Sequence, residues 1–464
     1  MNQNAIQTSE TLSGLAQCLP AGRLITDPDI LSTYAHDEAE QAAYELPAAV
    51  ARPGDASDVV AIVRYCAERG IPIVARGAGT GLSGGANALR GSIVISFESM
   101  NRIVKIDPNE RLAIVQPGVV NNDLRQACAE HGLWYPPDPA SAPWSTIGGN
   151  VSTNAGGICC VKYGVTRDYV LGIEAVTGRG ELLRLGRRTA KCAAGYDLAG
   201  LFVGSGGTLG IITEITLRLR SARPAERTIV GYFDHLEAAG RAAAAIWASG
   251  VVPSALELVD RYCLRAVDEW KNMGLMDAGN VLLLARSDAP GQAGEAEADT
   301  ILECFDKAGA TWSARSSDEY EAEALFAARR LVYPALERLG AVLGEDICVP
   351  RMMVPEMLAW FEQIASEYGI YIATIAHIGD GNLHPMVVVP KDDPAIGHRA
   401  HEAFARIIDK ALTMGGTVSG EHGVGLVKKR GFAIEVGPVV LDLHRSIKAA
   451  FDPAGIFNPT KIFE

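Results

Sequence analysis

The sequence of 464 residues lacks long apolar runs and an excess of basic residues, and each absence excludes a class of protein. No stretch reaches the roughly 18 apolar residues of a membrane-spanning helix, and the first residues lack the basic and apolar segments of a secretory signal. The 42 Lys and Arg against 55 Asp and Glu give a net charge of −13, which disfavours nucleic acid or an anionic membrane as main partner. We therefore expect a cytoplasmic protein, with peripheral attachment to the inner membrane as the only membrane association open to it.

Paired cysteines are missing as well. The nine cysteines contain no C-x-x-C pair and no iron–sulfur spacing, so a disulfide framework and a cluster of that kind are not expected. Scattered thiols are typical of a reduced cytoplasmic protein. Hydrophobic residues, by contrast, make up 48% of a chain longer than one core usually serves, which predicts two or three globular domains.

A glycine-rich loop at residues 76–87 (RGAGTGLSGGAN) is the most distinctive segment of the sequence. Glycine adopts positive φ without steric cost, and successive N–H groups in such a loop can turn inward around a pyrophosphate. The G-x-G-x-x-G pattern is present, but the few residues between Gly85 and Gly91 leave no room for the helix that a dinucleotide fold places there. We expect the helix upstream instead, at 58–69, capped by Ser57 and ended by Gly70. An ordinary turn remains the alternative for the loop.

A second unusual segment, residues 135–160 (YPPDPASAPWSTIGGNVSTNAGGICC), is too long for a structureless connection. Its prolines suit a surface loop, whereas its apolar residues between glycines suit burial. We interpret it as a second wall of the same ligand site, with Asn150, Thr153 and Asn154 as hydrogen-bonding groups.

Strands and helices flank these segments in a mixed order that indicates an α+β protein. A β-α-β unit over 48–75 delivers the glycine loop, and a hairpin is expected over 170–185. From about 227 to 430, alternating strands and helices predict a sheet with helices on one face, and the apolar tail is expected to dock back on the first domain. The predicted boundaries are 1–221, 222–430 and 431–464. In the second region the expected helices are 235–249, 295–308, 319–338, 355–368 and 394–414.

Two histidine segments near the end of the second region are candidate metal ligands. HIGDGNLHP carries His377 and His384, and SGEHGVG carries Glu421 and His422. Two histidines and a carboxylate with an open position are the ligands of a catalytic divalent metal. The alternatives are structural histidines and a Glu421 paired with Lys428 or Lys429.

These motifs together resemble one family. RGAGTGLSGGA, PPDP followed by TIGGNVSTNAGG, GSGGTLGIITEITLRL, HIGDGNLHP, SGEHGVG and FDPAGIFNP occur in an order similar to that of the FAD-linked D-2-hydroxyacid dehydrogenases of the vanillyl-alcohol oxidase superfamily, over nearly the whole chain. The resemblance implies a two-lobed FAD domain of the PCMH type, a ferredoxin-like α+β cap, and a C-terminal tail that returns to the FAD domain. It also implies noncovalent FAD, because Thr80 occupies the position of the histidine that bonds the flavin in covalent members.

The resemblance further implies a set of site residues. His377, His384 and Glu421 would bind a divalent metal, zinc or manganese, while His422 would be the general base. Arg329 in FAARRLVYPAL would bind the substrate carboxylate, although Phe326 replaces the tryptophan usual there. The implied FAD-binding residues are Arg76, Gly77, Ala78, Gly79, Thr80, Gly81, Leu82, Ser83, Pro137, Ser141, Thr146, Gly148, Gly149, Asn150, Thr153, Asn154, Gly157, Ile211, Ile212 and Asn458.

These roles match the chemistry of oxidising a 2-hydroxy acid, which needs a cation for the carboxylate, a Lewis acid at the C2 oxygen, a base and a hydride acceptor. Met386 and Gly344 stand where relatives that take 2-hydroxyglutarate place asparagine and lysine, so D-lactate or a glycolate-like acid is the expected substrate. The electron acceptor would be quinone, a cytochrome, an electron-transfer flavoprotein, oxygen or a partner subunit, and a homodimer is compatible with the sequence.

Three alternatives stay open: a D-2-hydroxyglutarate dehydrogenase, a noncatalytic flavoprotein subunit of a larger oxidase, and an aryl-alcohol or alkyl-glycerone-phosphate type of enzyme. The last would not need the histidine pair with Glu421 and His422.

Overall fold

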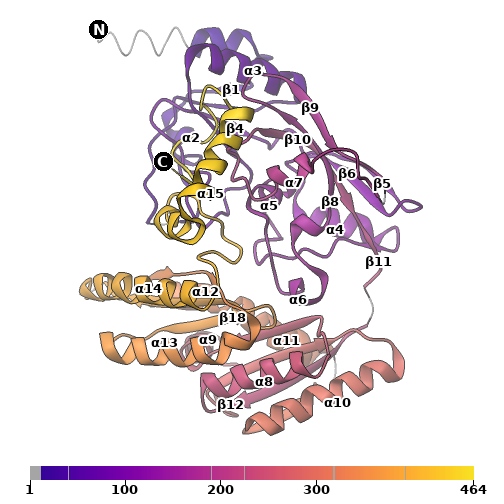
Figure 1. Ribbon diagram of the computed structural model, residues 1–464, viewed down its shortest axis with the longest axis vertical. Coiled ribbons are helices and arrows are strands. Elements are labelled where there is room, and N and C mark those ends of the chain that lie inside the picture. Colours follow the sequence, from indigo (N-terminus) through magenta and orange to yellow (C-terminus); the bar gives the residue numbers. More distant parts are fainter. Residues whose placement is uncertain are drawn as a thin grey trace. The chain divides into compact units, whose positions relative to one another are not determined.

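A computed structural model describes residues 12–39, 41–189, 191–223, 225–316, 319–391 and 393–463 of the chain (Figure 1). The chain forms two compact units, each assembled from separate segments. The first comprises the described residues of Met1–Gly156, Val165–Arg223 and Glu421–Glu464, and the second those of Gly157–Gly164 and Pro224–Gly420. Within the described residues, no helix is long and apolar enough to cross a membrane.

The first unit begins with the β-α-β arrangement that delivers the glycine loop. Strands β2 (Ala49–Ala51) and β3 (Ile73–Arg76) both pair in parallel with β4 (Ile93–Ser96), and β1 (Leu24–Ile25) pairs antiparallel with β2. Helix α3 (Ala56–Arg69) buries Val59, Ile62, Val63 and Cys66 in the core of this sheet. The sheet thus fixes where the loop after β3 begins.

The N-cap of α3 differs from the prediction. Asp55, rather than Ser57, accepts hydrogen bonds from the backbone N–H groups of Ser57 and Asp58, at 2.8 and 3.1 Å. A carboxylate two residues earlier competes successfully because its charge also suits the positive end of the helix dipole. Gly70 ends the helix at φ 63°, as expected.

A second sheet of the first unit is antiparallel, with the order β5-β6-β10-β8-β9. The predicted hairpin is present as β8 and β9. The hydrophobic core on this sheet includes Ile173, Ile215 and Leu217. The strands are β5 (Ile103–Asp107), β6 (Leu112–Val115), β8 (Val170–Val176), β9 (Leu182–Gly186) and β10 (Ile211–Arg218), and a separate pair is formed by β7 (Leu133–Trp134) and β11 (Arg220–Ser221).

The helices of the first unit include two features that the sequence did not indicate. Helix α5 (Ile147–Thr153) lies inside the segment interpreted as a second wall of the ligand site, and α15 (Lys429–Phe451) contains a break at Gly437 (φ 72°) before Pro438. The tail beyond α15 does return to the first sheet, since Phe457 bridges Ile73 in parallel. The remaining helices are α2 (Pro28–Ser32), α4 (Asn121–Ala129), α7 (Leu198–Phe202) and η1 (Thr166–Asp168).

The second unit is built on an eight-stranded antiparallel sheet with the order β15-β12-β14-β13-β18-β19-β16, and β17 also pairs with β19. Its strands are β12 (Arg227–Phe233), β13 (Ala255–Val259), β14 (Val281–Ser287), β15 (Trp312–Arg315), β16 (Ala341–Gly344), β17 (Ile347–Cys348), β18 (Ala373–His377) and β19 (Asn382–Val389), with η2 (Arg351–Met353) after β17.

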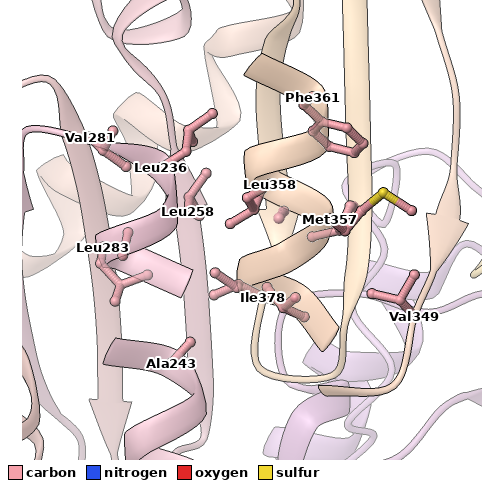
Figure 2. Close-up of a cluster of buried hydrophobic side chains, with 14 of the residues drawn as sticks. Leu236, Ala243, Leu258, Val281, Leu283, Val349, Met357, Leu358, Phe361 and Ile378 are labelled. Carbon is pink, nitrogen blue, oxygen red and sulfur yellow. The ribbon is translucent and has the colours of Figure 1, made fainter. Parts of the chain in front are cut away.

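Helices cover both faces of this sheet, whereas the sequence pattern predicted helices on one face only. On one face, α8 (Leu236–Ala248), α10 (Gly291–Ala308), α13 (Val354–Tyr368) and α14 (Ala395–Thr413) pack over Leu258, Leu283 and Val387, and Figure 2 shows part of this cluster. On the other face, α9 (Arg261–Lys271), α11 (Glu319–Arg330) and α12 (Val332–Glu337) pack over Val259 and Leu282. The prediction failed because β13 and α9 were not recognised and because α11 and α12 were read as one helix.

A short segment, residues 157–164, leaves the first unit and belongs to the second. Its helix α6 (Cys160–Tyr163) packs on β13, and Lys162 and Tyr163 both hydrogen-bond the carboxylate of Asp288, which is 3% exposed. Val161 lies against Gly379, two residues beyond β18. We call residues 157–164 the strap.

Candidate active site

The glycine loop follows β3 directly and is closely packed at its start. A Cβ on Gly77 would overlap the hydroxyl of Thr146, and Gly79 has φ 81°, so both positions favour glycine. Thr146 in turn caps α5 by accepting from the N–H of Gly149 at 3.3 Å. Packing therefore brings the two segments predicted to form one site side by side in the first unit.

The loop presents a run of backbone donors. Among the described residues, the N–H groups from Gly77 to Gly85 donate to no backbone or side-chain acceptor of the protein. Buried backbone donors are almost always paired, and these residues are only half-exposed at most positions. Consecutive unpaired N–H groups on a glycine-rich loop suit a bound diphosphate, so the residues present fit the pyrophosphate of FAD.

Arg76, at the start of the loop, supports the loop rather than projecting from it. Its guanidinium is buried and donates to the carbonyl oxygen of His36 at 2.7 Å and to that of Thr33 at 3.4 Å. Burial lowers its pKa, and the charge of Asp37 partly opposes that shift. Arg76 thus contributes positive charge beneath the loop and holds it against residues 33–36.

Several side chains implied as flavin-binding are already engaged by the protein. The amide of Asn150 accepts from Asn121 at 2.9 Å and donates to Ser145 at 3.3 Å. The hydroxyl of Thr153 donates to the carbonyl oxygen of Gly149 at 3.2 Å. These side chains shape the wall around α5, and contact with a cofactor would come chiefly from backbone atoms there.

The C-terminal tail closes the same region of the first unit. Asn458 donates to the carbonyl oxygens of Gly85 and Gly206, at 3.0 and 2.7 Å. Lys461, 2% exposed, donates to the carbonyl oxygens of Gly85 and Asn87. The implied residues of three distant segments are therefore brought together, although Ile211 and Ile212 lie in hydrophobic cores.

Residues 421–425 are attached to the glycine loop within the first unit. Ser83 donates through its hydroxyl to the carbonyl oxygen of His422 at 3.1 Å, and its own carbonyl accepts from the N–H of Leu426 at 2.7 Å. A Cβ on Gly156 would lie against the carboxylate of Glu421. The predicted base and the predicted third metal ligand thus lie beside segments predicted to bind FAD.

In the second unit, His377 and His384 form a buried pair. The rings are perpendicular, with centroids 5.4 Å apart, because β18 and β19 are neighbouring antiparallel strands. Each ring has a buried carboxylate beside it: Glu257 accepts from His377 Nδ1 at 2.7 Å, and Asp346 lies 3.8 Å from His384 Nδ1. Metal-binding histidines usually have such carboxylate partners, so this donor set fits a zinc- or manganese-like ion.

Arg329, the predicted ligand of the substrate carboxylate, belongs to the same cluster. It lies at the end of α11, 8% exposed, and its Nε donates to the second oxygen of Glu257 at 3.1 Å. Phe326, one turn earlier, is buried beneath the guanidinium of Arg286, which lies 3.8 Å from the ring centroid. This cation–π contact stabilises the position of α11, the helix that carries Arg329.

Glu257 and Asp346 belong to this cluster but were not predicted from the sequence. Both side chains are fully buried, and Asp346 also accepts from Asn382 at 2.7 Å and from Ser419 at 2.9 Å. For Glu257, the available signal was its place as a lone acidic residue inside the apolar run SALELV, since an unpaired buried charge is costly and implies a partner. The predicted metal set draws His377 and His384 from the second unit and Glu421 from the first, and it stays a prediction.

Comparison with known proteins identifies the family of the chain. Residues 47–186 match the family described as "FAD binding domain", and residues 223–462 match "FAD linked oxidases, C-terminal domain". The chain is 39% identical over 444 residues to the glycolate oxidase subunit GlcD of Bacillus subtilis (strain 168), a match covering 96% of this chain and 93% of that protein.

Two further relatives are each 32% identical. One is a D-lactate dehydrogenase of Anaerostipes hadrus, matched over 98% of this chain and 97% of the relative. The other is a D-2-hydroxyglutarate dehydrogenase of Stutzerimonas stutzeri (strain A1501), matched over 95% and 96%.

The fold is shared with p-cresol methylhydroxylase, whose substrate-bound structure superposes with a TM-score of 0.83 at 18% sequence identity, covering 100% of this chain and 97% of that one. This shared fold confirms the α+β fold with its returning tail. The family matches and the relatives confirm the family resemblance and FAD as cofactor. The chain belongs to the FAD-linked oxidases and is an FAD-linked oxidoreductase.

Proposed function

We propose that the protein oxidises a D-2-hydroxy acid, D-lactate or a glycolate-like monocarboxylate, to the 2-oxo acid. The observation that carries the proposal is the buried array of Arg329, Glu257 and His377 beside His384 on one face of the sheet of the second unit. A fixed cation next to metal-binding imidazoles is what an acid with a neighbouring hydroxyl requires. The names of the three relatives, which refer to glycolate, D-lactate and D-2-hydroxyglutarate, support the substrate class.

Arg329 would hold the substrate carboxylate. Its Nε is bonded to Glu257, so the two terminal nitrogens would form the paired hydrogen bonds that guanidinium makes with carboxylate. This fixes the orientation of the carbon that bears the hydroxyl. FAD, when bound, supplies the acceptor for the hydride from that carbon.

His422 would accept the proton of the substrate hydroxyl. Its backbone is held by Ser83, which limits the positions its ring can take. A divalent cation bound by His377, His384 and Glu421 would polarise the C2 oxygen and make that proton easier to remove. Gly420 packs against Asn382 and Asp346. Glu421 is the next residue, and the Cα atoms of consecutive residues are about 3.8 Å apart, which supports Glu421 as the third ligand.

Met386 and Gly344 favour a small substrate. The two residues are cross-strand partners in β19 and β16, and Met386 is 3% exposed on the face that carries His384. A second carboxylate near an apolar side chain would lose hydration without gaining a partner, at a cost of several kcal/mol. Arg330, Arg351 and Lys428 are the cations that could still hold a second carboxylate. Of these, Arg351 donates to the carbonyl oxygen of Gly379 at 2.9 Å, and Arg330 lies 3.8 Å from Glu323.

Two other functions remain candidates. The match to a D-2-hydroxyglutarate dehydrogenase favours the diacid as substrate, and the word "subunit" in the name of the Bacillus subtilis relative favours a flavoprotein that acts only with partners. Electrons would leave through quinone, a cytochrome, an electron-transfer flavoprotein, oxygen or a partner subunit, which would suit a cytoplasmic or peripherally attached protein and is compatible with a homodimer.

The test is reduction of an artificial dye by the isolated, FAD-loaded chain with a panel of D- and L-2-hydroxy acids. We expect turnover with D-lactate or glycolate and none with L-lactate. Turnover of no acid, with FAD and metal both bound, would contradict catalysis by the isolated chain and favour the subunit alternative.

A further inference from the structure

We infer that Glu257 is a positioning residue that aligns the metal-binding and substrate-binding parts of the site at once. This inference rests on the proposed function. Glu257 is fully buried in β13, and neither the family motifs nor the comparisons assign it a role. One carboxylate oxygen accepts from His377 Nδ1 at 2.7 Å, and the other accepts from Arg329 Nε at 3.1 Å.

The contact with His377 sets the orientation of its ring. An imidazole whose Nδ1–H donates to a carboxylate is fixed as one tautomer, and a metal would then be bound through Nε2. The interaction also holds the ring perpendicular to that of His384 across the β18–β19 pair. Without the carboxylate, His377 would keep its place on β18 but could rotate away from the position that binding requires.

The contact with Arg329 sets the orientation of the guanidinium. Because Nε is used internally, the terminal nitrogens remain as the edge that recognises a carboxylate. Glu257 also compensates the charge of a guanidinium that is 8% exposed. An arginine at the end of a helix has several rotamers, and the bond to β13 selects one of them.

A purely structural role would not require this residue type. Buried ion pairs often contribute little to stability relative to an apolar pair of the same size. A glutamine would also fail to replace Glu257, because its amide has only one accepting oxygen, whereas His377 Nδ1 and Arg329 Nε both donate. The carboxylate is therefore the group that satisfies both donors together.

The test is Glu257→Gln in the full-length holoprotein. We expect FAD content equal to that of the parent, a 10- to 100-fold loss of affinity for Zn²⁺ or Mn²⁺ measured by titration, and at saturating metal a KM for D-lactate raised at least about ten-fold. The matched control is Glu226→Gln, which removes another carboxylate paired with a buried arginine, Arg286, that keeps Thr228 and Glu323 as partners. The control should keep the parental metal affinity and the parental KM.

A second variant separates position from charge. Glu257→Asp keeps the negative charge beside Arg329 but is one methylene shorter, so it cannot reach both donors, and we expect metal affinity, KM or both to be impaired. Parental metal affinity and KM in Glu257→Asp would overturn the inference, because charge alone would then suffice.

Metal affinity is measured without turnover, so it also distinguishes the two proposals. If the parent oxidises no 2-hydroxy acid, the proposed function fails, and parental metal affinity in Glu257→Gln would still overturn the role of Glu257.

Discussion

The hydroxyl of Ser83 donates a hydrogen bond to the carbonyl oxygen of His422 at 3.1 Å, although 339 positions separate the two residues in the sequence. The contact attaches the segment with the predicted base to the glycine loop. A further bond attaches the same segment to the C-terminal tail, because the N–H of Ile462 donates to the carbonyl oxygen of Gly425 at 2.8 Å.

We expect Ser83→Ala to lower kcat roughly five-fold, because a lost hydrogen bond of this kind is worth about 1 kcal/mol, while bound FAD stays at the parental level. Steady-state dye reduction and flavin absorbance measure the two effects. Ser446→Ala, which removes an exposed hydroxyl bonded to the carbonyl oxygen of Asp442, is the control and should change neither. Parental kcat in Ser83→Ala would show that the bond does not position His422.

FAD should be released by acid. Thr80 stands where covalent members of the superfamily have histidine, and a threonine hydroxyl does not form that bond to the flavin. Precipitation with trichloroacetic acid should leave a colourless pellet and the full flavin absorbance in the supernatant. A yellow pellet would mean that another residue of the chain is bonded to the cofactor.

Loss of either imidazole of the proposed metal site should remove metal without removing flavin. His377→Ala and His384→Ala are each expected to lose the bound divalent ion and most turnover, since two ligands seldom retain an ion that needs three. Elemental analysis and the flavin spectrum report the two properties separately. His398→Ala, a change at an exposed histidine on α14, is the control. Normal turnover in both site variants would make the two histidines structural.

D-lactate should be preferred over D-2-hydroxyglutarate. The expected ratio of kcat/KM is at least ten, because Met386 offers the second carboxylate no hydrogen bond. Introducing an acceptor and donor with Met386→Asn should lower that ratio, whereas Met386→Leu should preserve it. A preference of the parent protein for the diacid would contradict the assignment of substrate size.

Stability should increase with pH between about 7 and 10 through Lys461. Burial lowers the pKa of its ammonium to about 7, and the charge of Asp37 partly opposes this shift. In the unfolded chain a lysine keeps a pKa of about 10.4, so above pH 7 the unfolded state binds more protons and the free energy of unfolding rises by up to about 1.4 kcal/mol per pH unit. Below pH 7 this group adds no pH dependence, because both states are protonated.

Urea unfolding of the parent and of Lys461→Met at pH 7, 8 and 9 measures that effect. The difference in free energy of unfolding between the two proteins should shift toward the parent as pH rises. A difference independent of pH would show that the ammonium stays charged in the folded protein.

Local sequence patterns predicted the fold where the determinants lie close together in the chain. The β-α-β unit, whose helix ends at Gly70, and the β8–β9 hairpin depend on neighbouring residues, and both were predicted. The N-cap was wrong by two positions, because Asp55 and Ser57 are both competent caps and the choice depends on the chain before α3. Helices on both faces of the sheet of the second unit were missed because burial of a strand on two sides depends on distant segments.

The candidate site shows the same division. His377 and His384 follow from a motif within eight residues, whereas the partnership with Glu257 joins β13 to β18 across 120 positions. The side chain of Asn150 has a polar character that suggested a ligand contact, yet it is used internally with Asn121 and Ser145. Residue type indicated the chemistry, but only the fold decides which partner each side chain has.

The strap has a consequence for the modularity of the protein. The chain passes between the two units at residues 156/157, 164/165, 223/224 and 420/421, so neither unit is one continuous gene segment. A fragment of residues 224–420 would lack Lys162 and Tyr163, leaving the buried carboxylate of Asp288 without two partners. Exchange of the second unit between relatives would therefore require two insertions made together, which favours divergence of the whole chain over shuffling of its parts.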